Sequence, residues 1–388
     1  MTSDDMPPHD MLPSDMLPGD VAHRALLPSG LADLLPPDAA REAALVEAML
    51  GIFAAHGYER VKPPLLEFED SLLAGSGAAV AEQTFRLMDP VSQRMMGLRA
   101  DTTPQVARIA ATRLANVPRP LRLSYAGQVL RVRGTPLDSA RQLPQAGVEL
   151  IGADTAMADA EVALLGVEAL AAVGVTDVAL DVLMPTMTPA LLDAARVPPR
   201  LRQKLARALD RKDAADVAAL AAEAGAPALT ALLAAAGLAD GALAALDAAD
   251  LPPAARAIAD NAAAVIAAIR ARAPGLRITL DPVEFRGFTY HTGVAFTLYG
   301  RGGELARGGR YLSGDEPATG LTLYPDAVLR AAPPAAEAPR LFIAPGQDGT
   351  AHRAAGFITV AALSARDTPR ALRCSHILHG QTPVPIED

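Results

Sequence analysis

The sequence predicts an α+β fold in which helices flank an antiparallel sheet. Two alternating segments joined by a polar turn, at residues 120–152, indicate a pair of strands with one buried face. A second set of alternating strands with many glycines occupies residues 284–310. Between these sets, Ala-rich helical segments at about 195–275 indicate a helical insertion. A short C-terminal α/β segment completes the predicted fold.

Length and composition set limits on the class of protein. A chain of 388 residues corresponds to two or three domains. The net charge of −9 and the lack of a Lys/Arg run argue against nucleic acid as the main partner, although a local basic groove stays open. Cys374 is the only cysteine, which excludes an intrachain disulfide and a Cys-rich zinc site. A free thiol is typical of the reducing cytosol.

Targeting signals are not visible in the sequence. Asp4, Asp5 and Asp10 stand where a signal peptide would carry positive charge. Apolar runs stay shorter than the ~18 residues that a membrane-spanning helix needs. The sequence therefore predicts a cytoplasmic protein without membrane contact.

Composition also suggests the domain boundaries. Residues 1–25 are rich in Met, Pro and Asp, with DMLP written twice, and we expect a disordered tail. Residues 26–330 form the main predicted domain. Residues 331–339 are a linker by composition, and residues 340–388 form the C-terminal segment, with a strand at 341–345 and a helix at 350–365.

The first half of the main domain contains a helix, an extended segment and a hairpin. The helix starts at Asp38 and ends at Gly57, and prolines interrupt the extended segment at 58–68. This pair could build a two-fold dimer interface or simply pack in the core. The hairpin spans 85–98, and Pro104 opens the next helix after Asp101 and Thr103. Asp101 could cap that helix, bind a ligand, or do both.

Polar side chains beside glycines mark the candidate site. The period of two places Gln145, Gly147 and Glu149 on one face of a strand, with open space between an amide and a carboxylate. An amino acid needs acceptors for its ammonium group and a cation for its carboxylate. The candidate residues are Asp101, Thr103, Gln145 and Glu149 as the ammonium side, Arg286 as the carboxylate side, Tyr290 and His291 as the side-chain pocket, and Arg131 nearby.

Other expectations concern the elements after the candidate strands. A helix is expected at 159–173, a strand at 177–183, a loop reaching 316–320, and a strand from Thr322 running into a helix. Motifs for nucleotide loops, zinc proteases and serine hydrolases are missing from the sequence, as is an obvious nucleophile. We therefore predict neither a cofactor nor a metal.

Four ordered blocks resemble a known family. LRADTTPQVAR, the strand–turn–strand block, RGFTYHTGVAF and GGRY with GDEPATG are similar to the catalytic domain of class II histidyl-tRNA synthetases. They are closer still to the paralogous regulatory subunits of ATP phosphoribosyltransferase. The resemblance covers about 26–330 and implies a class II aminoacyl-tRNA synthetase-like fold. It places histidine contacts at Asp101, Thr103, Gln145, Glu149, Arg286, Tyr290 and His291, and a vestigial nucleotide contact at Arg131.

Departures from the synthetase pattern separate the two families. Arg133 and Pro144 replace an acidic residue and a histidine, and the place of a second ATP-binding arginine falls on about Ala327. Loss of that cation should cost several orders of magnitude in a reaction that depends on charge stabilisation. His291 replaces the second tyrosine of the histidine block. The segment after residue 339 has less than half the length of an anticodon-binding domain of roughly a hundred residues.

The resemblance therefore implies a non-catalytic regulatory subunit in the first step of histidine biosynthesis. It implies a short catalytic ATP phosphoribosyltransferase chain as partner, self-association as a dimer, and L-histidine as an allosteric effector, in this pocket or elsewhere in the complex. It does not predict tRNA as a partner. A divergent histidyl-tRNA synthetase and a stand-alone amino-acid-binding adaptor are the alternative functions.

Overall fold

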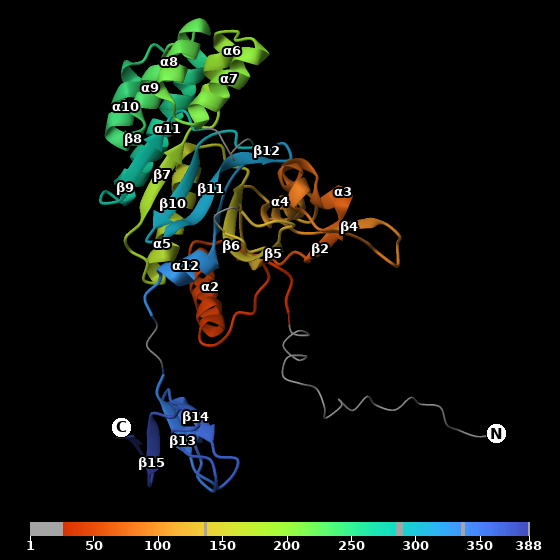
Figure 1. Cartoon of the computed structure of the whole chain (residues 1–388), viewed down its shortest axis with the longest axis vertical. Helices are drawn as coiled ribbons and strands as arrows, with labels where there is room; N and C mark the ends of the chain where they lie inside the picture. The colour runs from red at the N-terminus through yellow and green to blue at the C-terminus, as the bar shows by residue number, and fades with distance from the viewer. Residues whose placement is uncertain (1–25, 136–137, 285–289, 335–337, 387–388) are drawn as a thin grey trace, which may run out of the picture. The chain divides into compact units, whose positions relative to one another are not determined.

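The computed structural model describes residues 26–135, 138–284, 290–334 and 338–386. The chain forms two compact units that divide between Ala332 and Pro333 (Figure 1). In the described chain, no helix combines the length and apolar character needed to cross a membrane.

A nine-stranded sheet forms the centre of the first unit, in the order β1-β5-β6-β12-β11-β10-β7-β9-β8. The strands from β5 to β7 in this order pair antiparallel, whereas β1 pairs parallel with β5 and β7 pairs parallel with β9. The bounds are β1 Glu59–Arg60, β5 Leu121–Leu130, β6 Gln142–Ile151, β7 Ala179–Leu183, β8 Gly237–Leu238, β9 Arg277–Asp281, β10 Ala295–Gly300, β11 Gly303–Ser313 and β12 Glu316–Leu323.

Apolar helices cover one face of this sheet. Helix α5 packs on β12 and β6, and α2 packs against α5. Ten residues of α5 are buried, because nearly every turn carries Ala, Val or Leu on all sides. Thr155 caps its N-terminus by accepting a hydrogen bond from the Ala158 amide. The helices of this layer are α2 Asp38–Ala55, α5 Ala156–Ala172, α11 Pro253–Arg272 and α12 Pro325–Ala331.

The opposite face carries helix α4, Thr103–Thr112, which packs on β11 and β6. Val106 and Ala110 of α4 join Leu123 and Tyr125 of β5 in a smaller apolar cluster. A three-stranded sheet in the order β2-β4-β3 lies in the same part of the chain. The remaining elements here are β2 Leu66–Phe68, α3 Glu69–Leu72, the 3-10 helix η1 Gly75–Gln83, β3 Arg86–Met88 and β4 Met95–Leu98. Asp89 closes the predicted hairpin by accepting hydrogen bonds from the amides of Val91 and Ser92.

The helical insertion forms a bundle at one end of the sheet (Figure 1). Each of four successive helices buries a large apolar residue: Leu205, Val217, Leu229 and Leu246. These side chains form a core, which explains why the Ala-rich sequence folds into a packed bundle. The short strand β8 within this region was not expected from the sequence. The helices are α6 Met187–Ala194, α7 Pro199–Asp210, α8 Ala214–Glu223, α9 Ala228–Ala235 and α10 Ala239–Ala248.

The loop expected at 316–320 is wrong. Strand β12 begins at Glu316, and a tight turn at Gly314 joins it to β11. Pro317 and Gly320 lower the strand propensity of this stretch. Pairing with β11 on one side and β6 on the other outweighs that propensity and holds the segment in the sheet.

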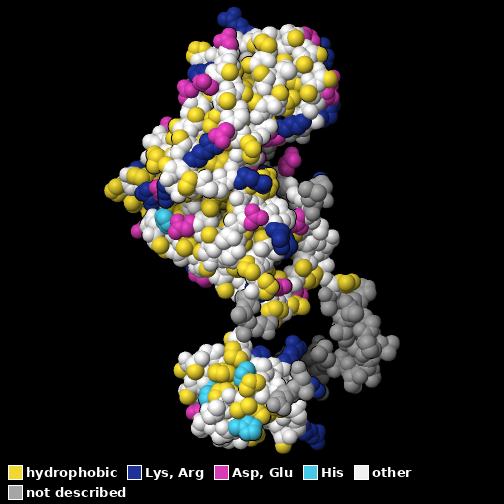
Figure 2. All heavy atoms as spheres, turned by 90° about the vertical axis from the view of Figure 1, so that its left-hand side faces the viewer, with side chains coloured by type: hydrophobic (Ala, Val, Ile, Leu, Met, Phe, Trp, Pro, Cys, Tyr) yellow, Lys and Arg dark blue, Asp and Glu magenta, His cyan; other side chains and the backbone are white. Residues whose placement is uncertain are grey.

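The C-terminal unit is a four-stranded sheet in the order β14-β13-β15-β16. The helix expected at 350–365 is wrong beyond Ala354, because Gly356 adopts a positive φ and ends it, and the following Ile-Thr-Val sequence forms a strand. Histidine and hydrophobic side chains are interspersed on the face of this unit in Figure 2. The elements are β13 Arg340–Ile343, α13 Thr350–Ala354, β14 Ile358–Ala361, β15 His376–His379 and β16 Thr382–Pro385.

Candidate functional site

The start of helix α4 is fastened to strand β6. The Thr102 amide and hydroxyl both donate to the Gln145 side-chain oxygen, at 3.1 and 2.9 Å. Both residues are buried. The Asp101 carboxylate accepts a hydrogen bond from the amide of Thr103, the first residue of the helix, at 3.2 Å, while Thr102 occupies the N-cap position. Burial raises the pKa of Asp101, and the nearby Arg131 charge acts in the opposite direction.

Glu149 is the centre of the site. Only 1% of the residue is exposed, and its carboxylate accepts hydrogen bonds from the Thr103 hydroxyl at 2.7 Å and the Tyr311 hydroxyl at 2.8 Å. Burial raises the pKa of Glu149 to about 8; the two hydroxyl hydrogen bonds lower it, and the charge of Asp101 raises it. Near neutral pH the side chain is therefore mostly protonated, and a ligand cation would favour its ionised form.

Glycines form the floor beside Glu149. Gly309 of β11 pairs with Gly320 of β12, which pairs with Glu149 of β6, so the three residues form one row across the sheet. A Cβ atom added at Gly320 would overlap the Glu149 carboxylate, and one added at Gly309 would lie 2.6 Å from a His291 ring carbon. Neighbouring groups therefore approach the backbone closely at both glycines. Any side chain in these places would fill the site.

Aromatic rings enclose the opposite side. The Tyr290 and His291 rings stack with centroids 4.1 Å apart, and Tyr290 meets the Tyr311 ring edge-on at 6.3 Å. Thr103, Glu149 and these three aromatic residues line one cavity of about 20 Å³. This volume holds about one water molecule. A ligand of amino-acid size would therefore need the cavity to widen.

The structure thus gathers four of the predicted site residues around one cavity: Thr103, Glu149, Tyr290 and His291. Asp101 and Gln145 lie directly behind them, at the helix start and in β6. Arg286 lies outside the described residues. Arg131 follows β5, where its guanidinium donates to the Ala100 carbonyl oxygen at 3.5 Å.

Sequence reasoning missed Arg307, Tyr311 and Thr322, which also line the cavity. The hydroxyls of Thr322 and Tyr125 lie 2.7 Å apart beneath it. Burial raises the pKa of Tyr125 and Tyr311 well above its usual range, so both phenols keep their protons. Tyr311 belongs to the quoted GGRY block, and Arg307 immediately precedes its glycines. The positions of Tyr311 and Arg307 beside this glycine pair were the sequence signal that could have identified them as site residues.

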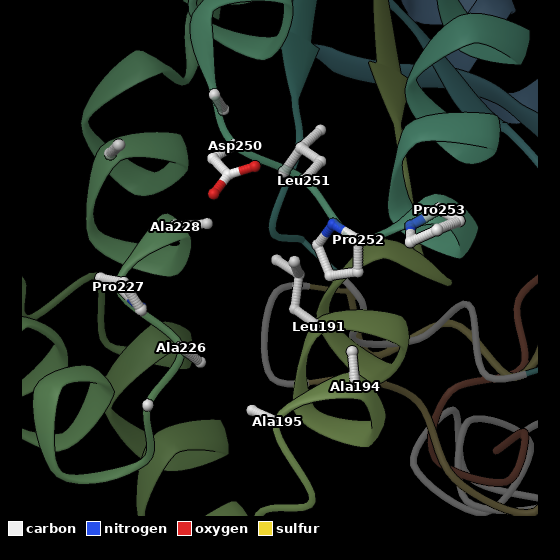
Figure 3. A pocket seen from close by; sticks show the side chains of 13 residues that line it. Leu191, Ala194, Ala195, Ala226, Pro227, Ala228, Asp250, Leu251, Pro252 and Pro253 are labelled. Atoms are coloured by element: carbon white, nitrogen blue, oxygen red, sulfur yellow. The ribbon is translucent and has the colours of Figure 1, made fainter.

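A larger cavity lies elsewhere, in the helical insertion (Figure 3). It measures about 770 Å³, and its side chains are alanines, leucines and prolines with one carboxylate, Asp250. Such a lining offers little to a zwitterionic amino acid, which needs opposite charges at close range. Among the described residues, no cluster of three or more His, Cys, Asp or Glu side chains could hold a metal ion.

Known proteins resemble this chain in sequence. A family model described as histidyl-tRNA synthetase matches residues 30–328. A protein from Paramagnetospirillum magneticum, named ATP phosphoribosyltransferase regulatory subunit, is 56% identical over 376 residues, covering 94% of this chain and 99% of the relative. A protein of the same name from Rhodospirillum centenum is 52% identical, covering 94% and 97%.

The chain belongs to the family of ATP phosphoribosyltransferase regulatory subunits. Membership of this family favours a non-catalytic regulatory subunit over the divergent synthetase, and it confirms the resemblance read from the sequence blocks.

Solved structures confirm the class II synthetase-like fold. A regulatory subunit/histidyl-tRNA synthetase from Bacillus halodurans superposes with a TM-score of 0.76 at 23% identity, covering 90% of this chain and 95% of that chain. A chain from the ATP phosphoribosyl transferase complex of Thermotoga maritima superposes with a TM-score of 0.58 at 17% identity, covering 73% and 97%. At these identities, the likeness concerns the fold alone.

Proposed function

We propose that this chain binds the short catalytic chain of ATP phosphoribosyltransferase in the cytoplasm and raises its activity. The observation that carries the proposal is the 56% identity, along nearly the whole chain, to a protein named as the regulatory subunit. Docking would act through a coupling free energy, by favouring the active arrangement of the catalytic chain.

The test is the activity of the short catalytic chain from the same organism, with and without this protein. A large rise on mixing is expected. If both chains are folded and the activity does not change, the proposal is wrong. A histidine-dependent ATP–pyrophosphate exchange assay covers the synthetase alternative, and we expect no signal, because Ala327 packs against the apolar core where the synthetases have a cation.

We further propose that the cavity beside Glu149 binds L-histidine. The carboxylates of Glu149 and Asp101 would accept hydrogen bonds from the ammonium group. Glu149 is buried, and Asp101 is partly buried. Gln145 would take a positioning role, because its oxygen already accepts two hydrogen bonds from Thr102. Tyr290 and His291 would move outward to admit the imidazole.

Calorimetric titration of L-histidine into the chain and into its complex with the catalytic chain tests this site. Binding is expected, and a Glu149→Gln variant should bind at least tenfold more weakly, because a hydrogen bond to a charged group contributes about 1.5–3 kcal/mol. Lys62→Gln, a change of an external charge, serves as the matched control. Histidine binding that is equal in the Glu149 variant would place the effector elsewhere, and no binding to either preparation would end the sensor proposal.

A dimer is also proposed, through the three-stranded sheet β2-β4-β3 and the turn between β3 and β4. Helix α2 buries Met49, Leu50 and Phe53 in the core of its own chain, which favours core packing for that helix. Large apolar side chains stay exposed instead on and near β2, β3 and β4: Leu66 36%, Leu87 37%, Met88 62%, Val91 90% and Met95 41%. Exposed apolar side chains gathered in one region of a chain are typical of an association surface.

Light scattering after gel filtration would test this surface. The wild type should have the mass of a dimer, and Met88→Glu combined with Val91→Glu should shift it toward the monomer. Leu363→Glu, at a 94% exposed position of the C-terminal unit, is the control. A dimer that survives the double substitution would exclude this patch.

A further inference from the structure

Arg307 lies on the same face of the sheet as the Glu149 site. In strand β11 it pairs with Thr322 of β12, and Thr322 in turn pairs with Gly147 of β6. Because side chains alternate along a strand, the face shared by Arg307 and Gly147 is also the face of Gly309 and Glu149. Strand β12 alone separates β11 from β6 (Figure 1), so the backbones of Arg307 and Glu149 stand two strands and two residues, or about 12 Å, apart.

A guanidinium and a carboxyl group therefore line the same cavity. Arg307 and Glu149 both contribute to its lining, and Gly309 and Gly320 lie between them without side chains. An arginine side chain is long enough to cross most of the distance over such an open floor. The arrangement suits a small zwitterion, with its ammonium group at the carboxylate and its anionic group at the guanidinium.

The ion pair between Arg307 and Glu304 would not prevent this contact. Its guanidinium donates to the Glu304 carboxylate at 2.8 Å, three residues earlier in the same strand. The two side chains are 37% and 27% exposed, and a partly solvated pair of this kind is only weakly stabilising. A guanidinium has five N–H donors, so it can keep Glu304 and still donate to a ligand carboxylate.

We infer that Arg307 binds the carboxylate of the amino-acid ligand and selects free amino acids over the corresponding amino alcohols. This inference rests on the proposed histidine site, and it adds a residue that the sequence blocks do not indicate. Arg286, the residue that the resemblance assigns to the carboxylate, lies outside the described chain. Arg286 and Arg307 could act together on the carboxylate, and substitution of Arg307 tests the contribution of Arg307 alone.

Calorimetry with two ligands isolates this contact. L-histidine and L-histidinol share the ammonium and the imidazole, but histidinol has a neutral hydroxymethyl group in place of the carboxylate. Arg307→Met should weaken histidine binding about tenfold or more, since a charge-assisted contact is lost, and should leave histidinol binding within about twofold. Arg307→Lys keeps the charge and should recover part of the histidine affinity. Arg301→Met removes the same charge from the exposed turn before β11 and should change neither affinity.

Each other outcome has a distinct meaning. If the wild type binds histidine and Arg307→Met binds it equally well, the inference is wrong while the histidine site stands. If histidine and histidinol weaken together, Arg307 acts on the shape of the site rather than on the carboxylate, and the inference is again wrong. If the wild type binds neither ligand, the histidine site and this inference both fall. Arg307→Lys decides the question if Arg307→Met does not fold.

Discussion

Two buried carboxylates lie on opposite faces of the same sheet, and the chain treats them differently. Asp159 in helix α5 is fully buried, and the Arg310 guanidinium donates to it at 2.7 and 3.1 Å. Glu149, on the other face, is equally buried but is held by two hydroxyl groups. Arg310 and Tyr311, the respective partners, are neighbours in strand β11.

This difference distinguishes Asp159, whose carboxylate has a structural role, from Glu149, which is a candidate for ligand binding. A guanidinium compensates the charge of Asp159 within the protein, so burial of the pair joins the helical layer to the sheet. Hydroxyl donors satisfy the geometry of Glu149 without supplying a charge, and its pKa rises to about 8. An acid that lacks an internal cation in this way can ionise when a ligand cation binds beside it.

The largest expected effect concerns the structural pair. Arg310→Met should destabilise the first unit by about 3–5 kcal/mol, because Asp159 is left as a buried charge without its cation. Urea unfolding followed by circular dichroism measures the change. The double variant Arg310→Met with Asp159→Asn should regain part of the loss, and a cost below about 1 kcal/mol for the single variant would contradict the comparison.

The stability that Glu149 contributes to the fold should decrease as the pH rises. Its pKa is higher in the folded chain than the ordinary value near 4.5, so its protonated form stabilises the fold at low pH and that contribution disappears as the pH rises toward about 8. Between pH 5 and 8, the wild type should lose about 3 kcal/mol relative to Glu149→Gln, which resembles the protonated form. Parallel slopes for the two proteins would show that Glu149 is ionised throughout.

Histidine binding should release a proton from this site. At pH 7 a group with a pKa of about 8 is about nine-tenths protonated, and a bound ammonium favours its ionisation. Titrations in buffers of different ionisation enthalpy should reveal close to one proton released, with affinity rising up to about tenfold per pH unit below pH 8. Glu149→Gln should remove the release, and a proton count near zero in the wild type would exclude the coupling.

The smallest effect concerns the helix start behind the site. Thr102→Val keeps the side-chain shape but removes the hydroxyl that donates to Gln145, and should cost about 1 kcal/mol of stability. Thr112→Val, an exposed change at the end of α4, is the control. If both variants unfold alike, the buried hydrogen bond does not hold α4 to β6.

Local rules explain how much could be predicted from the sequence. The period of two placed Gln145 and Glu149 on one face, and Pro104 marked the start of α4, because both patterns act within a few residues. The Glu149–Tyr311 hydrogen bond joins residues 162 positions apart, and it depends on the strand order, which the alternation does not contain. The same holds for Arg310 and Asp159, whose burial was not expected from an apolar helix pattern. Strand β12 was missed because its neighbours, not its own propensity, keep it extended.

The glycine row makes the proposed effector site easy to lose. A change from glycine to alanine needs a single base substitution, and at Gly320 the added methyl group would occupy the space of the Glu149 carboxylate. The patch on β2, β3 and β4 belongs to a different sheet and would stay in place. If this cavity senses histidine, selection for histidine overproduction should favour such substitutions, since they would abolish feedback and preserve assembly. Gly309 and Gly320 would then determine whether histidine can inhibit its own synthesis.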